Sequence, residues 1–174
     1  YASMPNYPAR GDIASAKALL DSAGIKPDAN GVRIRAILDL IPYGEDWRRA
    51  GEYLKQVLGD IGIKLELRYE DVPTWLKRIY HNYDFVMNVN YFYQLPDPVL
   101  GVHRHYGTDQ IRKGTHFVNS SRYSNSELDE LLASGATEAN AQKRTQIYKK
   151  IQDILARDMP VVNLFELQFL TVYN

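Results

Sequence analysis

The sequence predicts a three-layer α/β domain with a mostly parallel sheet that is flanked by helices. Three observations lead to this fold class. Apolar and polar residues alternate over residues 63–70, as in a strand with one solvated face. Two further apolar stretches, at residues 32–40 and 83–89, have the length of strands, and amphipathic helical patterns separate all three. Strands that are joined by helices run mostly parallel.

The expected elements follow one another in the order α-β-α-β-α-β-α-α-α-β. Asp12 is suited to cap the first helix, and Gly24 stands where a helix commonly ends. Ser124 and Glu127 have the spacing of a capping box, which predicts a helix that begins at Ser124, and Pro160 ends the last helix. The expected strands cover residues 32–40, 63–70, 83–89 and 161–172, and the other expected helices cover residues 13–23, 45–61, 71–81, 97–105 and 140–157.

Length and composition limit the classes of function. With 174 residues the chain is long enough for one domain with its own core, so we interpret residues 1–174 as a single lobe. The 21 basic and 21 acidic residues balance, which argues against a nucleic-acid binder. The chain has no cysteine, which excludes a disulfide or a thiolate site, and no apolar run of the ~18 residues that a membrane span needs.

The stretch from Tyr83 to Tyr106 is the main candidate for a binding site. An apolar strand leads there into an aromatic loop, and ligands of α/β sheets bind where strands end. We therefore expect one wall of a ligand cleft, and the alternative is packing at the end of the sheet. The candidate binding residues are Tyr91, Tyr93 and Gln94 in this loop and Tyr43 after the first strand, while Asp97 and Pro98 are expected to act as a helix cap and turn.

A second candidate is the basic sequence His103-Arg104-His105. Arg104 is a candidate for binding an anionic group of a ligand, and the alternative is an ion pair at the surface or between lobes. The two histidines are two residues apart and do not share a helix face, so no metal site is predicted. We also find no GxSxG or HExxH motif, and therefore predict a protein that is not an enzyme and has no cofactor.

Several motifs, taken in order, resemble the C-terminal lobe of family 5 solute-binding proteins. These are the extracytoplasmic dipeptide, oligopeptide and nickel receptors of ABC transporters. The resemblance covers nearly the whole chain and depends on the order and spacing of the motifs. They are AKALLDSAG (16–24), LGDIGIKLEL (58–67), DVPTWLKR (71–78), YDFVM (83–87), PDP (96–98), RYSNSELDELL (122–132) and ILARDMPVVNL (154–164).

The resemblance implies a periplasmic or extracytoplasmic receptor of two lobes that close on a small solute by hinge motion. Its partners would be the solute, the permease subunits of an ABC importer and a second lobe. That lobe would lie mainly before Tyr1, and relatives continue past Asn174, so the chain is interpreted as an excised lobe. A sensor that uses the same fold to signal to another protein is the alternative function.

The resemblance also bears on the ligand. Relatives that bind peptides carry a Gly-Trp pair, followed by an Asp that pairs with the α-ammonium of the peptide. Asn90 and Tyr91 stand at the Gly-Trp positions here, and Gln94 stands at the Asp position. A neutral amide cannot form the charge-assisted bond of a carboxylate. We therefore expect a peptide-like, sugar or opine-like solute that does not depend on a free amino terminus, unless Asp97 supplies the charge instead.

Overall fold

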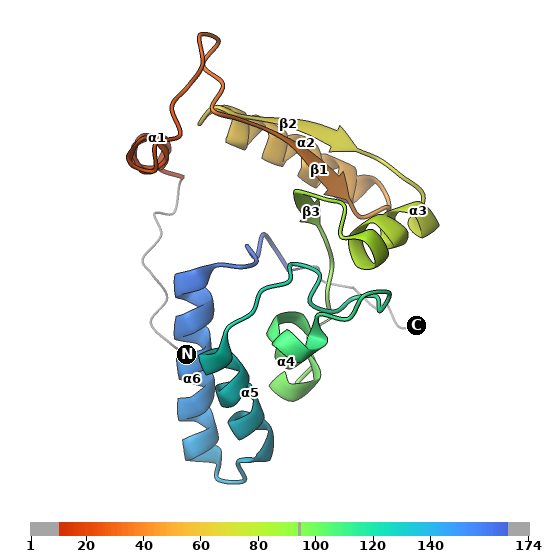
Figure 1. Cartoon of the computed structure of the whole chain (residues 1–174), viewed down its shortest axis with the longest axis vertical. Coiled ribbons are helices and arrows are strands. Elements are labelled where there is room, and N and C mark those ends of the chain that lie inside the picture. The colour runs from red at the N-terminus through yellow and green to blue at the C-terminus, as the bar shows by residue number, and fades with distance from the viewer. Residues whose placement is uncertain (1–10, 94, 167–174) are drawn as a thin grey trace, which may run out of the picture. The chain divides into compact units, whose positions relative to one another are not determined.

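The computed structural model describes residues 11–93 and 95–166 (Figure 1). Internal contacts divide the described residues into two compact units, one of residues 11–124 and the other of residues 125–166. This division does not decide whether residues 1–174 form one lobe, which stays a prediction. Among the described residues, no helix is long and apolar enough to cross a membrane.

The first unit contains a parallel sheet of three strands in the order β2-β1-β3. The strands are β1 (Ile34–Leu40), β2 (Ile63–Arg68) and β3 (Met87–Val89). In the register of the sheet, Leu38 of β1 lies beside Leu67 of β2 and Met87 of β3. Helices follow each strand, which confirms the predicted α/β class with a parallel sheet.

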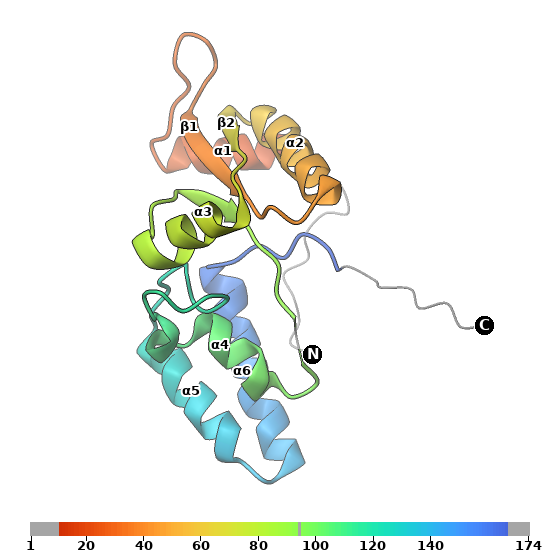
Figure 2. The same cartoon turned by 90° about the vertical axis from the view of Figure 1, so that its right-hand side faces the viewer.

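Helices α1 (Ile13–Ser22) and α2 (Glu45–Gly59) agree closely with the predicted bounds. Asp12 caps α1 by accepting a hydrogen bond from the Ser15 backbone N–H at 2.9 Å, as expected. Both views show α2 running alongside β1 and β2 (Figures 1 and 2). The approach is close at Gly51, where an added Cβ would lie 2.5 Å from a methyl carbon of Leu40. Leu40 thus packs against α2.

The segment between β2 and β3 begins as α3 (Val72–Leu76) and continues as the π-helix η1 (Lys77–Asn82). The Asp71 side chain caps α3 by accepting from the Thr74 backbone N–H at 2.8 Å. This segment supplies large residues to the core of the unit. The buried core residues are Leu38, Leu40, Ile41, Trp47, Leu65, Trp75, Ile79, Tyr80, Val89 and Val118.

The third strand is shorter than predicted. The expected strand covers residues 83–89, but β3 contains only Met87–Val89. Tyr83 instead ends η1 in the left-handed conformation, with φ at 53°, and the Asp84 backbone N–H donates to the Arg78 carbonyl. At Tyr83 and Asp84 the backbone is therefore leaving η1, although the sequence pattern places these two residues in a strand.

The helix expected over residues 97–105 is divided in two. A 3-10 helix, η2 (Pro98–Leu100), is followed by α4 (Val102–Tyr106), and Gly101 at φ −124° and ψ −64° interrupts the helical conformation between them. One further short 3-10 helix, η3 (Thr108–Gln110), begins the stretch of residues 107–122, which otherwise has no regular structure, as expected for a loop.

The second unit contains α5 (Ser126–Thr137) and α6 (Ala141–Asp158), which lie side by side in both views (Figures 1 and 2). The predicted cap Ser124 is wrong. Asn125 caps α5 by accepting from the Leu128 backbone N–H at 3.1 Å, and the Ser124 hydroxyl accepts a hydrogen bond from Thr108 instead. The strand expected over residues 161–172 is absent from residues 161–166, and its remainder lies outside the described residues.

Candidate functional site

Four aromatic side chains gather where β1 and β3 end, and we call them the aromatic cluster: Tyr43, Trp47, Tyr91 and Tyr93. The Tyr91 ring is at its centre. Its centroid lies 6.5 Å from that of Tyr43, 5.7 Å from that of Trp47 and 4.9 Å from that of Tyr93. All three pairs have the edge-to-face geometry that aromatic quadrupoles favour.

Backbone and side-chain hydrogen bonds hold the two loops of the cluster together. The Ile41 backbone N–H donates to the Val89 carbonyl at 3.1 Å, which joins the ends of β1 and β3. Asn90 accepts from the Tyr91 backbone N–H at 2.8 Å through Oδ1 and donates to the Tyr80 hydroxyl at 2.7 Å through Nδ2. The loop after β3 is therefore fixed to the fully buried Tyr80 in the core.

The cluster presents both ring faces and hydroxyl groups. Tyr43 and Tyr93 are 46% and 62% exposed, whereas Trp47 is buried beneath them. Desolvation, together with the neighbouring Tyr93 and Tyr43, raises the pKa of Tyr91 to about 12. The Tyr91 hydroxyl is thus neutral at physiological pH, and its oxygen is buried within the cluster.

A small pocket adjoins the ends of β1 and β2. Its volume is about 220 Å³. Gly44, the N-cap residue of α2, has a φ of 111° that favours glycine, and this glycine lies in the wall of the pocket. The guanidinium carbon of Arg48 lies 4.6 Å from the ring centroid of Tyr69. The pocket is lined by Leu40, Ile41, Pro42, Gly44, Arg48, Tyr69 and Glu70.

The structure brings together three of the binding residues that the sequence predicts. Tyr43 and Tyr93 both contact Tyr91 in the aromatic cluster, whereas Gln94 lies outside the described residues. Trp47 also contacts Tyr91 and is a member of the cluster that sequence reasoning missed. Its position four residues after Tyr43, beside the end of a strand, is the signal that could have identified it.

The other predicted residues lie in the helices that follow. Asp97 is the N-cap of η2, where its side chain accepts from the Val99 backbone N–H at 3.0 Å, and Pro98 is the first residue of that helix. Arg104 is half-buried in α4, and its Nε has no hydrogen-bond partner among the described residues. Burial, reinforced by the charge of Arg104, lowers the pKa of the adjacent His105 to about 4. A role of Arg104 in binding an anion stays a prediction.

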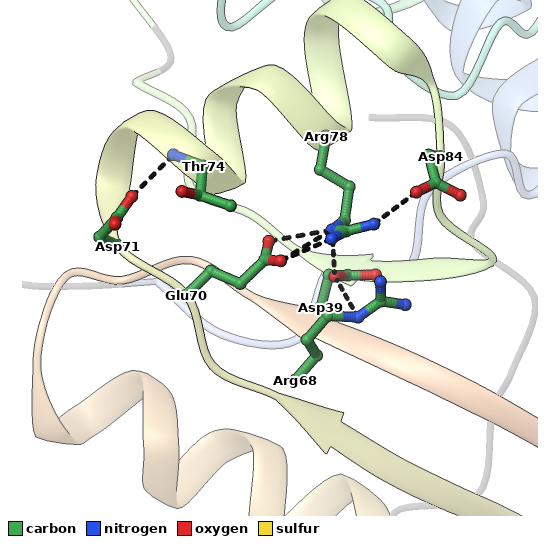
Figure 3. Close-up of polar contacts among 7 residues, drawn as sticks. All are labelled: Asp39, Arg68, Glu70, Asp71, Thr74, Arg78 and Asp84. Carbon is green, nitrogen blue, oxygen red and sulfur yellow. Dashed lines mark hydrogen bonds and ion pairs between the residues drawn. The ribbon is translucent and has the colours of Figure 1, made fainter.

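Sequence reasoning missed a group of charged residues that we call the ion network: Asp39, Arg68, Glu70, Arg78 and Asp84 (Figure 3). Asp39 is fully buried, although it lies in an otherwise apolar part of β1. Its Oδ1 lies 3.1 Å from Arg68 Nε and 3.7 Å from Arg78 Nε. A lone aspartate within an apolar strand was the available signal.

Arg78 connects the ion network across the unit. Its guanidinium donates to both carboxylate oxygens of Glu70, at 2.6 to 3.0 Å, and also contacts Asp84 (Figure 3). Burial raises the pKa of Asp39 to about 6, although the charges of Arg68 and Arg78 act in the opposite direction. The Arg78 hydrogen bonds lower the pKa of Glu70. The network therefore joins β1 and β2 to η1 through charge.

Comparison with known proteins adds independent findings. Residues 1–113 match the model of the family described as "Bacterial extracellular solute-binding proteins, family 5 Middle". Di/tripeptide-binding protein 1 of Pseudomonas aeruginosa is 25% identical over 150 residues, which cover 86% of this chain and 27% of that protein. The chain thus spans only about a quarter of the length of this relative.

Solved structures share the fold. The ABC transporter substrate-binding protein CtaP from Listeria monocytogenes superposes with a TM-score of 0.71 at 27% identity, covering 88% of this chain and 30% of that chain. A periplasmic oligopeptide-binding protein from Thermotoga maritima, solved with mannohexaose bound, gives a TM-score of 0.77 at 23% identity, covering 89% of this chain and 31% of that chain.

Proposed function

Because the chain belongs to the bacterial extracellular solute-binding proteins of family 5, we propose that it forms one wall of the ligand cleft of an ABC importer's receptor. The receptor would act outside the cytoplasm and deliver its solute to permease subunits. The observation that carries this proposal is the aromatic cluster. It joins residues from the ends of two parallel strands, which is where ligands of α/β sheets bind.

The exposure of the cluster supports a role in binding. Tyr43 and Tyr93 leave large parts of their rings open, and Leu95 and Leu100, which follow on the same loop and in η2, are 50% and 57% exposed. The exposed rings of Tyr43 and Tyr93, which both contact Tyr91, form an apolar surface of the kind that is typical of a binding or interaction site. A second lobe that closes over a bound solute would cover it.

The chemistry of the cluster favours a neutral polar solute. Tyrosine rings offer flat apolar faces, and tyrosine hydroxyls can form hydrogen bonds, a combination that suits a sugar ring or an amide-rich peptide. Gln94 supplies no negative charge for an α-ammonium group. We therefore propose a peptide-like or sugar-like solute whose free amino terminus, if it has one, contributes little to binding.

A thermal-shift screen on the two-lobed protein tests the proposal. The panel contains free di- and tripeptides, the same peptides with acetylated amino termini, and short oligosaccharides. A ligand that binds the folded state raises the melting temperature in proportion to RT ln(1 + [L]/Kd). We expect a shift from an oligosaccharide, or equal shifts from a free peptide and its acetylated form. A shift that is confined to free peptides would overturn the proposed solute class.

Two variants locate the site. Tyr93→Ala removes the most exposed ring of the cluster, and we expect it to weaken binding about tenfold, which corresponds to ~1.4 kcal/mol. Tyr53→Ala is the matched control, because Tyr53 is 65% exposed but lies on α2 outside the cluster. Equal affinities of the two variants for the same ligand would contradict the assignment of the cleft wall to the aromatic cluster.

A further inference from the structure

Two histidines that are 35 residues apart in the sequence lie side by side in the structure. His81 is near the end of η1, and His116 is in the loop that follows η3. Their Nε2 atoms are 3.2 Å apart, and both side chains are exposed to solvent. Neither residue belongs to the aromatic cluster or to the ion network.

We propose that His81 and His116 form a binding site for a divalent transition-metal ion such as Zn²⁺ or Ni²⁺. Imidazole nitrogens bind zinc at about 2.0–2.1 Å. An ion at that distance from both Nε2 atoms, 3.2 Å apart, would subtend an angle of about 100°, close to the tetrahedral value. The observed separation of the two nitrogens therefore matches two ligands of one ion.

Tyr80 fixes the positions of the two histidines relative to each other. It precedes His81 in the chain and is fully buried in the core. Its carbonyl accepts a hydrogen bond from the Gly114 backbone N–H at 2.8 Å, and its ring lies 5.8 Å from that of His116 and 5.7 Å from that of Phe117. One buried residue thus fixes both η1 and the loop, so the pair is preorganised.

The loop has an unusual backbone on both sides of His116. Gly114 has a φ of 87°, and Phe117, which has a side chain, has a φ of 56°. A residue with a bulky side chain is strained in this conformation. Strain of this kind persists only when the surroundings enforce it, and it concentrates at binding sites.

The donor set determines the class of metal. Two neutral imidazoles suit zinc, nickel and copper, whereas calcium and magnesium require oxygen ligands. No group of three or more histidine, cysteine or acidic side chains that could hold a metal gathers in the part of the chain that the structure describes. Water would therefore fill the remaining positions, and such an open site is expected to bind in the micromolar range rather than more tightly.

Titration calorimetry with ZnCl₂, NiCl₂ and MgCl₂ tests this site in the full protein. We expect zinc or nickel, but not magnesium, to bind. Either His81→Gln or His116→Gln alone is expected to weaken that binding at least tenfold, because one imidazole cannot chelate. Both residues are exposed, so these variants should fold, and circular dichroism checks this.

His103→Gln is the matched control. His103 is a partly exposed histidine whose Nε2 lies 3.0 Å from Asp109 Oδ1, so it has a partner of its own. This variant is expected to retain the affinity of the unchanged protein. The proposal is overturned if zinc and nickel fail to bind, or if both single variants at His81 and His116 bind them normally. Neither result depends on the identity of the solute in the proposed cleft, because the readout is metal binding alone.

Discussion

The aromatic cluster and the ion network are built on the same sheet but differ in almost every physical respect. The cluster lies where β1 and β3 end and exposes two of its four rings. The network is centred on Asp39, which is buried within β1, and links it to β2 and η1 (Figure 3). Exposed rings remain available for a ligand, whereas the buried Asp39 carboxylate lies beside the guanidinium groups of Arg68 and Arg78.

This difference suggests a division of tasks within the unit. Removal of one partner from a buried charge network leaves another charge without compensation, so its main effect is on stability. Removal of an exposed ring leaves the core intact, so its main effect is on binding. We therefore expect changes in the network to alter unfolding and changes in the cluster to alter affinity, and each of the following variants tests that separation.

Arg78→Ala should have the largest effect. It removes the partner of Glu70 and Asp84 and one of the two positive charges beside Asp39. We expect a loss of about 3–5 kcal/mol in the free energy of unfolding, measured by urea denaturation. Arg49→Ala is the control, because its pair with Glu45 spans 4.0 Å at the exposed surface and should contribute about 0.5 kcal/mol or less. Equal losses in both variants would disprove the special role of the network.

Tyr91→Ala should affect both properties. Tyr91 contacts three other rings, so its removal is expected to cost about 2 kcal/mol of stability. It should also weaken solute binding more than tenfold in calorimetric titration. A variant that loses stability but binds the solute normally would assign Tyr91 to packing at the end of the sheet, which is the alternative stated for this loop.

Tyr91→Phe separates the ring from its hydroxyl. The ring contacts remain, so the free energy of unfolding measured in urea should change by no more than about 0.5 kcal/mol. The hydroxyl oxygen is buried in this structure, so it can donate to a solute only if binding exposes it, and affinity should then fall about threefold to tenfold, in keeping with ~1 kcal/mol for one hydrogen bond. Unchanged affinity would show that only the ring face matters.

Asp39→Asn should have the smallest effect at neutral pH and a visible effect on the pH profile. The pKa of Asp39 is raised from 3.8 to about 6, so the folded protein binds its proton more tightly than the unfolded chain does. Stability from this group is therefore highest below 3.8 and is lost as pH rises to about 6. The variant should lack this part of the slope.

The control for this profile is Glu66→Gln, which removes a carboxylate that is exposed on β2. It should leave the slope between pH 3.8 and about 6 as it is in the unchanged protein. A slope that persists in Asp39→Asn would show that Asp39 is not its source.

Much of the fold could be predicted because it is encoded locally. The bounds of α1 and α2 follow from helical periodicity and from caps such as Asp12, and the alternation over residues 63–70 identifies β2. The errors occur where a tertiary contact overrides the local pattern. Tyr83 is the first residue of the expected strand 83–89, yet it adopts the left-handed conformation and ends η1. Ser124 has the right spacing for a cap, yet its hydroxyl is bonded to Thr108.

The candidate site shows the same limit. Tyr43, Tyr91 and Tyr93 could be proposed because the ends of parallel strands meet at one edge of a sheet. The meeting of Asp39 with Arg68 and Arg78, or of His81 with His116, depends on the register of β1 with β2 and on the path of a loop. Neither of these two contacts can be predicted from the spacing of the residues along the chain.

The π-helix η1 makes this part of the molecule tolerant of a change in chain length. A π-turn closes its hydrogen bonds over one residue more than an α-turn, so η1 is equivalent to a one-residue insertion into a helix. Deletion of a single residue between Lys77 and Tyr80 would let the segment close as an ordinary α-turn. Tyr80 would then keep its place in the core, and His81 its place beside His116. A relative with a one-residue gap in this segment is therefore expected to keep both features, with an α-helix in place of η1.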